Sequence, residues 1–222
     1  MTKLELAKMI DHTLLKPEAT PAQIEKLCAE AAEYHFASVC VNPVYIPLAA
    51  RLLKGTGVKV CCVVGFPLGA IAPEQKAAEA ASCAAMGAEE LDMVIHVGAA
   101  KAGDWALVQR DIEGVVKAAA GHTVKVIIET CLLTDEEKEK MCDIVCEAGA
   151  DYIKTSTGFS TAGANFHDVE LMVKGVAGRC KVKAAGGIST VEDMEKFLAL
   201  GADRLGTSRA VKILNGEQAK GY

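Results

Sequence analysis

Short apolar runs rich in β-branched residues alternate with longer amphipathic segments from one end of the chain to the other. The short runs predict eight strands, at residues 10–11, 38–41, 59–64, 91–94, 125–128, 152–154, 182–184 and 204–206. Helix-start signals stand between them, because Thr20 with Gln23 and Thr134 with Glu137 each form a capping box. Strands that alternate with helices predict βαβ units and a parallel sheet.

Eight strands in 222 residues fit a single (β/α)8 TIM barrel better than an open doubly wound sheet. At roughly 150 residues per domain the length would also allow two small domains. No linker or shift of composition divides the chain, so we predict one domain over residues 1–222. Its polar end, residues 215–222, is predicted to be a mobile tail.

A three-residue pattern, Gly-Ala-acid, comes just before three of the predicted strands. Its copies begin at Gly87, Gly149 and Gly201. In each copy the glycine is placed to end a helix, and the turn leads into the next strand. The fifth residues after these glycines are Asp92, Lys154 and Gly206, and a looser copy at Gly178 leads to Lys183. Because these residues follow their glycines at equal distances in sequence, we expect them to lie at comparable heights near the carboxyl ends of the strands, where barrel enzymes carry their active sites.

Composition and charge exclude several classes of protein. Apolar residues make up 51% of the chain, which is too many for a disordered protein. The longest apolar stretch, residues 60–72, contains Pro67 and is too short to span a membrane. A net charge of −5 argues against nucleic-acid binding. The amino terminus shows no secretory signal, and nine cysteines without a C-x-x-C pair are typical of reduced thiols, so we expect a cytoplasmic protein.

Two lysines interrupt neighbouring predicted strands, Lys154 in the sixth and Lys183 in the seventh. Adjacent strands lie about 4.8 Å apart, so two inward ammonium groups would repel each other. Burial and a like charge can lower a lysine pKa from about 10.4 to roughly 7–8, where the neutral amine attacks carbonyl carbons and forms a Schiff base. One lysine as nucleophile and one as its perturbing neighbour is one interpretation. The other is a strand-end lysine that extends to solvent.

Asp92 interrupts another apolar run, in the fourth predicted strand. It suits a general acid–base that moves protons during catalysis, and equally a buried carboxylate that pairs with a lysine for stability alone. The spacing does not decide between the two.

Glycines gather after the last three predicted strands. Backbone amides in such loops, with a hydroxyl, can hold a phosphate at the carboxyl end of a barrel. The residues that fit this role are Gly158, Gly186, Gly187, Gly206 and Ser208.

Several motifs of other enzymes are missing from the sequence. It contains no complete G-x-G-x-x-G, no P-loop and no G-x-S-x-G. The five histidines are scattered and form no metal-binding pattern, so we expect no metal.

Four segments resemble the deoxyribose-phosphate aldolases: Asp11–Pro17, Glu90–Ile95, Ile153–Phe159 and Val182–Ile188. They occur in the family's order and span nearly the whole chain. The resemblance implies a class I aldolase on a TIM barrel that reversibly cleaves 2-deoxy-D-ribose 5-phosphate to D-glyceraldehyde 3-phosphate and acetaldehyde. It makes Lys154 the Schiff-base lysine, and Asp92 and Lys183 its partners in proton handling and pKa tuning. It implies no metal or organic cofactor, a sugar phosphate and aldehydes as ligands, and a homo-oligomer, either a dimer or a tetramer.

Two positions depart from the family pattern. His96 stands where asparagine is more usual, and Arg209 stands where a small residue is more usual. These departures bear on rate and specificity more than on reaction class. Tyr222, the last residue, is a further candidate, because it could fold over the barrel mouth and assist proton transfer.

Two alternative functions stay open. A sugar-phosphate isomerase or epimerase would use the same barrel and phosphate loops without a nucleophilic lysine. A non-catalytic sugar-phosphate-binding protein would bind its ligand without turnover.

Overall fold

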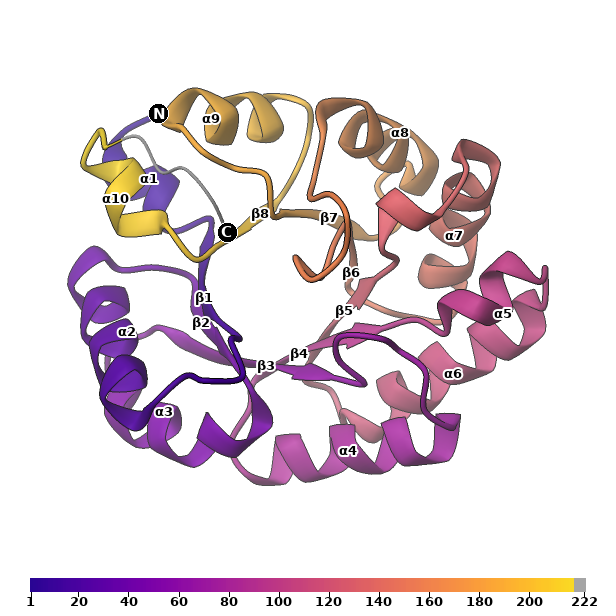
Figure 1. The fold of residues 1–222 in the computed structure, drawn as a ribbon, viewed down its shortest axis with the longest axis horizontal. Helices are drawn as coiled ribbons and strands as arrows, with labels where there is room; N and C mark the ends of the chain where they lie inside the picture. The colour runs from indigo at the N-terminus through magenta and orange to yellow at the C-terminus, as the bar shows by residue number, and fades with distance from the viewer. Residues whose placement is uncertain (218–222) are drawn as a thin grey trace.

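Eight parallel strands close into one barrel in their sequence order, as predicted (Figure 1). The computed structural model describes residues 1–217. The strands are β1 (Ile10–Leu14), β2 (Ser38–Val41), β3 (Lys59–Val64), β4 (Glu90–Val94), β5 (Thr123–Ile127), β6 (Tyr152–Lys154), β7 (Lys181–Ala185) and β8 (Arg204–Thr207). Pairing of β1 with β8 closes the barrel. β2, β3 and β6 have the predicted bounds, whereas β1 runs three residues further than predicted.

Helices surround the barrel and connect its strands (Figure 1). The longer ones are α2 (Pro21–Tyr34), α3 (Ile46–Leu53), α4 (Pro73–Ala85), α6 (Trp105–Ala118), α7 (Asp135–Glu147), α8 (Phe166–Val176) and α9 (Val191–Ala199). Shorter ones are α1 (Lys3–Ala7), η1 (Pro43–Tyr45), α5 (Val97–Lys101), η2 (Thr130–Leu132) and α10 (Ala210–Leu214). Both predicted capping boxes are confirmed, at the starts of α2 and α7. Within residues 1–217, no helix has the length and apolar character needed to cross a membrane.

Each strand presents two different faces. Its outward side chains pack against the helices, and Val39, Leu91 and Val126 are fully buried there. The inward face is largely polar and charged, although Cys40 and Cys61 form a small apolar cluster inside the barrel with Leu15 and Val63. The hydrophobic core is therefore the layer between barrel and helices, and the barrel interior is left for charged groups.

The Gly-Ala-acid copies form the turns that were predicted, with the glycines in the left-handed region at φ of 110°, 79° and 108°. Their acidic side chains do more than end the turn. Each accepts a hydrogen bond from a backbone N–H near the start of the preceding strand, over 3.2 Å for Glu89–Val60, 2.8 Å for Asp151–Val124 and 2.9 Å for Asp203–Val182. These bonds tie β4, β6 and β8 to the strands that precede them.

Candidate active site

The fifth residues of those copies all lie on the inward face of the barrel. Lys154 and Lys183 are directly opposite each other in the β6–β7 register. Both side chains are buried, with residue exposures of 4% and 0%. The prediction that the two amines lie on neighbouring strands and point into the barrel is therefore confirmed.

Asp92 lies between the two amines. Its Oδ2 accepts hydrogen bonds from Lys154 Nζ and Lys183 Nζ, each over 2.7 Å. Its Oδ1 accepts from Lys125 Nζ over 2.8 Å and from Cys61 Sγ over 3.1 Å. One carboxylate thus bridges three ammonium groups, so the lysine pair does not face each other as bare charges.

A second set of charged groups surrounds this centre. Asp11 Oδ2 is 2.5 Å from Lys183 Nζ, and Glu90 Oε2 is 2.6 Å from Lys125 Nζ. Arg204 joins the two acids, at 2.6 Å from Asp11 Oδ1 and 3.3 Å from Glu90 Oε1. Ion pairs thus run from the start of β8 to the end of β6.

The charges of this interior cluster nearly balance. In the described part of the chain its cations are Lys125, Lys154, Lys183 and Arg204, and its carboxylates are Asp11, Glu90 and Asp92. Four positive and three negative charges leave an excess of one. Release of a single proton from the cluster would make it neutral.

The ion pairs fix the charge of the groups that form them. Burial opposes ionisation of Asp92, but Lys125, Lys154 and Lys183 outweigh it and hold the pKa of that carboxyl well below its usual range. Burial likewise opposes the charge on Lys183, but Asp11 and Asp92 raise the pKa of its amine. Asp92 is therefore a carboxylate and Lys183 an ammonium at neutral pH.

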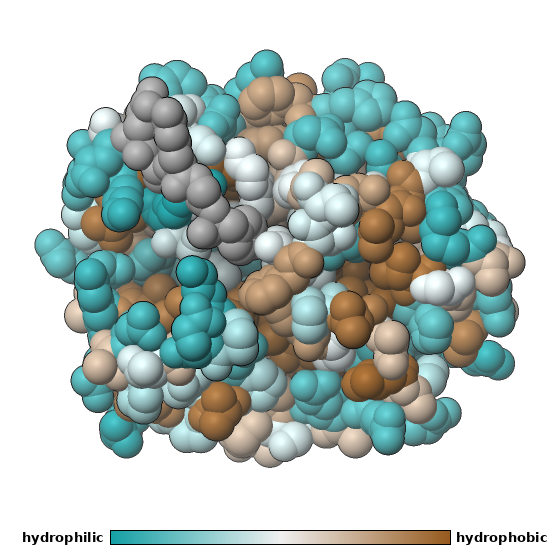
Figure 2. Space-filling model, viewed as in Figure 1, coloured by the Kyte–Doolittle hydropathy of each residue, from teal (hydrophilic) through white to brown (hydrophobic). Residues whose placement is uncertain are grey.

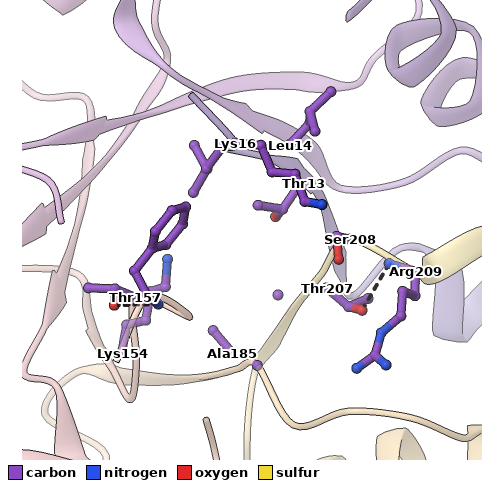
Figure 3. Close-up of a pocket in the computed structure, with 13 residues that line it drawn as sticks. Thr13, Leu14, Lys16, Lys154, Thr157, Ala185, Thr207, Ser208 and Arg209 are labelled. Carbon is purple, nitrogen blue, oxygen red and sulfur yellow. Dashed lines mark hydrogen bonds between the residues drawn. The ribbon is translucent and has the colours of Figure 1, made fainter. Parts of the chain in front are cut away.

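A pocket opens above the cluster at the carboxyl ends of the strands. Figure 3 shows the Lys154 amine pointing into it from below. The lining residues are Thr13, Leu14, Leu15, Lys16, Lys154, Thr157, Phe159, Ala185, Gly186, Gly206, Thr207, Ser208 and Arg209. Among these residues Lys154 is the cluster member that reaches the pocket, whereas Asp92 and Lys183 are not among the described lining residues.

Of the predicted phosphate residues, Gly186, Gly206 and Ser208 line this pocket. Gly158 and Gly187 belong to the adjoining loops and are not among the lining residues that the structure describes. Gly187 has a φ of 72°, and a Cβ there would lie 2.8 Å from the carbonyl oxygen of Ala164. Its role in the structure is thus to let two loop backbones approach closely. Tyr222 lies outside the described residues.

The pocket lining carries positive charge. Three of its residues, Lys16, Lys154 and Arg209, are cations, and the described lining contains no carboxylate. Arg209 precedes α10, and its guanidinium donates to the carbonyl oxygen of Ile188 over 3.1 Å. His96, the other departure from the family pattern, caps α5 through its Nδ1 and is not among the described lining residues. The lining therefore suits a small anionic ligand.

Glu129 organises the loop on one side of the pocket. It is 3% exposed and follows β5 with a φ of 54°, in the left-handed region that non-glycine residues seldom adopt. Its carboxylate accepts from the backbone N–H of Thr157 over 3.1 Å, and from the Thr157 hydroxyl. Thr157 Oγ1 in turn accepts from the backbone N–H of Phe159 over 3.0 Å. Glu129 thereby holds two pocket-lining residues.

Two groups of side chains have the ligand types of a metal site. Cys40, Cys61 and Asp92 lie within reach of one ion, as do Asp135, His167 and Asp168. Both oxygens of Asp92 already accept from ammonium groups, and the surrounding lysines would repel a further cation. Asp168 is likewise paired, with Lys138 at 2.7 Å. These donor sets fit ion pairing better than metal binding.

The comparisons with known proteins point to one family. The model of the DeoC/LacD family aldolases matches residues 6–211. The chain belongs to this aldolase family. A deoxyribose-phosphate aldolase from a Geobacillus species is 58% identical over 215 residues, which cover 96% of each chain. One from Streptococcus gordonii is 55% identical and covers 98% of this chain and 99% of its own.

Solved structures are similar as well. A putative deoxyribose-phosphate aldolase from Coccidioides immitis has a TM-score of 0.95 and 44% identity, with 97% of this chain and 87% of that chain covered. The deoxyribose phosphate aldolase from Aeropyrum pernix, described as tetrameric, has a TM-score of 0.91 and 38% identity, with 97% and 92% covered. The TIM-barrel prediction is thus confirmed for this aldolase.

Sequence reasoning missed several residues of the candidate site. They are Asp11, Cys61, Glu90, Lys125, Glu129 and Arg204. Lys125 carried the same signal that identified Asp92, a charge inside an apolar strand, but it lies outside the Gly-Ala-acid copies. Asp11 and Arg204 meet only because β1 pairs with β8, which no local pattern encodes.

Proposed function

We propose that this chain is a class I aldolase that reversibly cleaves 2-deoxy-D-ribose 5-phosphate to D-glyceraldehyde 3-phosphate and acetaldehyde. The observation that carries the proposal is the position of Lys154, whose amine joins a charged interior cluster to a cationic pocket. The relatives named deoxyribose-phosphate aldolase supply the substrate. We further propose that one domain carries the activity and that the chain forms a homo-oligomer in the cytoplasm.

The reaction begins with Lys154 as a neutral amine. The interior cluster has one positive charge in excess, so loss of a proton from Lys154 leaves it balanced. Nζ attacks the C1 aldehyde of the open-chain sugar, and the carbinolamine loses water to give a protonated imine. That imine is the electron sink of the reaction. No metal or organic cofactor is required for it.

Carbon–carbon cleavage needs a base. Removal of the C3 hydroxyl proton breaks the C2–C3 bond and leaves an enamine on Lys154. Asp92 is a carboxylate beside Lys154 Nζ and receives this proton through a water molecule. Protonation and hydrolysis of the enamine then release acetaldehyde. Lys183 stays charged, anchors Asp92 and stabilises its anion.

The phosphate is assigned to the cationic side of the pocket. Ser208 supplies a hydroxyl, Gly186 and Gly206 let the backbone come close, and Arg209 supplies charge. Gly158 and Gly187 shape the adjoining loops. Tyr222 stays a candidate for proton transfer to the enamine.

Borohydride trapping tests the proposal. Reduction in the presence of 2-deoxyribose 5-phosphate, followed by peptide mass mapping, is expected to find the adduct on Lys154. Acetaldehyde release should persist in EDTA and should fall by several orders of magnitude in Lys154→Ala, with circular dichroism unchanged. Lys174→Ala, at an exposed lysine of α8, is the matched control and should keep full activity. An adduct on another lysine, or turnover without an adduct, would refute the assignment.

A further inference from the structure

A pair of cysteines lies at the end of the barrel opposite the pocket. Cys146 is in the last turn of α7, and Cys180 comes just before β7. Their sulfur atoms are 2.9 Å apart, and both thiols are reduced. Because the pocket lies at the carboxyl ends of the strands and Cys180 precedes an amino end, the pair is remote from the proposed chemistry.

We propose that Cys146 and Cys180 are a reversible modification site, at which a peroxide-class oxidant forms an intramolecular disulfide. A disulfide requires a sulfur–sulfur distance of about 2.05 Å, so the two atoms need to close by less than 1 Å. Cys146 lies in the last turn of α7 and Cys180 immediately precedes β7, so the backbone beside each can follow so small a movement. The proposal is independent of the aldolase assignment.

Exposure distinguishes this pair from the other close cysteines. Cys40 faces Cys61 across β2 and β3, but both have 0% exposure. Cys146 and Cys180 are half-buried and line an open hollow at the surface. An oxidant dissolved in water therefore reaches this pair directly.

The hollow favours the chemistry. The described residues that line it include three cations, Arg179, Lys181 and Arg204, against a single carboxylate, that of Asp151. Arg179 interacts electrostatically with both sulfurs, so its positive charge stabilises the negative charge that develops on the reacting sulfur. Burial and the hydrogen bond with Cys146 raise the pKa of the Cys180 thiol, so we place Cys180 in the second step, in which its sulfur attacks with the proton still in place.

Hydrogen peroxide oxidises the pair in two steps. The Cys146 thiolate attacks one oxygen of hydrogen peroxide, the O–O bond breaks, and the departing hydroxide takes a proton to become water. The Cys180 sulfur then attacks the resulting sulfenic acid, the S–O bond breaks, and a second water leaves with the Cys180 proton. Two thiols are oxidised and one peroxide is reduced. An added dithiol reverses the reaction by thiol–disulfide exchange.

The disulfide would link two points 34 residues apart in sequence and join the end of α7 to the start of β7. Closing a loop of that length restricts the unfolded chain. We expect the melting temperature to rise by roughly 5–10 °C, with turnover within about twofold of the reduced enzyme. The disulfide would thus form under oxidising conditions and stabilise the folded chain.

Peroxide treatment of the full chain tests the proposal. The count of free thiols in denaturant should fall from nine to seven. Trypsin should release residues 141–154 linked to residues 180–181, and fragment ions should place the link on Cys146 rather than Cys142. Cys146→Ser and Cys180→Ser should each abolish the link and the rise in melting temperature. Cys131→Ser, at another half-buried cysteine, is the matched control and should retain both.

The proposal would be overturned by no loss of thiols, by a link to Cys142, or by a linked chain that melts no higher than the reduced one. Cys146→Ala and Cys180→Ala guard against a serine that disturbs folding. Each should melt like the reduced wild type and show no response to peroxide. A response to peroxide that persists in both alanine variants would assign the effect to other cysteines and refute the site.

Discussion

Replacement of Asp92 by asparagine separates stability from chemistry at the centre of the barrel. The substitution keeps the size of the side chain but removes a carboxylate that accepts from Cys61, Lys125, Lys154 and Lys183. The interior cluster would then hold four cations against two carboxylates. Breaking a buried ion pair by removing one partner costs roughly 3–5 kcal/mol. Lys125 keeps its ion pair with Glu90, and Lys183 keeps its ion pair with Asp11, so we expect a loss near the lower end of this range, about 3 kcal/mol.

Melting experiments measure this loss. For a chain of this size 1 kcal/mol corresponds to about 2–4 °C, so the melting temperature of Asp92→Asn should fall by roughly 6–12 °C. The pKa of Asp92 is lower in the folded chain than in the unfolded one. Its contribution is therefore complete above an unfolded pKa of about 3.9 and is lost as the pH falls through the folded value. The difference between wild type and variant should be constant from about pH 5 to pH 8 and should narrow below about pH 4.

Kinetics provide the second arm of the experiment. If Asp92 is the base for cleavage, turnover should fall by about 10²–10⁴-fold, while borohydride still traps substrate on Lys154. Asp11→Asn is the matched control, because Asp11 pairs with Lys183 and Arg204 in the same network. It should lower the melting temperature similarly and reduce turnover far less. The role of Asp92 as the base would be refuted if Asp92→Asn lost borohydride trapping as much as turnover. It would also be refuted if Asp92→Asn and Asp11→Asn reduced turnover equally.

Other perturbations test the surroundings of the site. Glu129→Ala removes the carboxylate that holds Thr157, so KM should rise about tenfold with a smaller change in kcat. Glu129→Gln should retain most of the activity, and an unchanged KM in Glu129→Ala would contradict this role. Arg209→Ala should raise KM for deoxyribose 5-phosphate by about 10–100-fold and leave turnover of unphosphorylated deoxyribose unchanged. Equal effects on both sugars would argue against a role of Arg209 in phosphate binding. Asp111→Ala leaves Lys76 buried without its carboxylate partner, so the free energy of unfolding measured by calorimetry should fall by about 3–5 kcal/mol. The double variant Lys76→Met/Asp111→Leu should restore most of this loss.

The fold could be predicted because its signals are local. A capping box such as Thr20 with Gln23, or a glycine such as Gly149 that ends a helix, determines where an element starts or stops without reference to the rest of the chain. The alternation of such elements then allows few topologies. The strand β1 was underestimated because its inward residues, Asp11 and Thr13, are polar, and the apolar pattern therefore ended early.

The site could be predicted only in part. Asp92, Lys154 and Lys183 were found because a charge inside an apolar strand is costly unless it is paired or functional. Their partners depend on contacts across the barrel, set by strand register and closure. Glu129 was missed because its signal is a backbone conformation at the end of β5, which leaves no mark on the sequence.

The number of ion pairs that each lysine makes in the interior cluster distinguishes the reactive lysine from the structural ones. Lys125 pairs with Glu90 and Asp92, and Lys183 pairs with Asp11 and Asp92. Lys125→Met and Lys183→Met each break two buried ion pairs, so each should destabilise the chain by roughly 3–5 kcal/mol. Within the described residues Lys154 pairs with Asp92 alone, so its removal breaks a single ion pair. Asp92 keeps Lys125 and Lys183 as partners. Lys154→Met should therefore melt within a few degrees of wild type, or above it, while it loses activity. A loss of stability as large as that of Lys183→Met would show that Lys154 is held in the cluster for the fold rather than for chemistry.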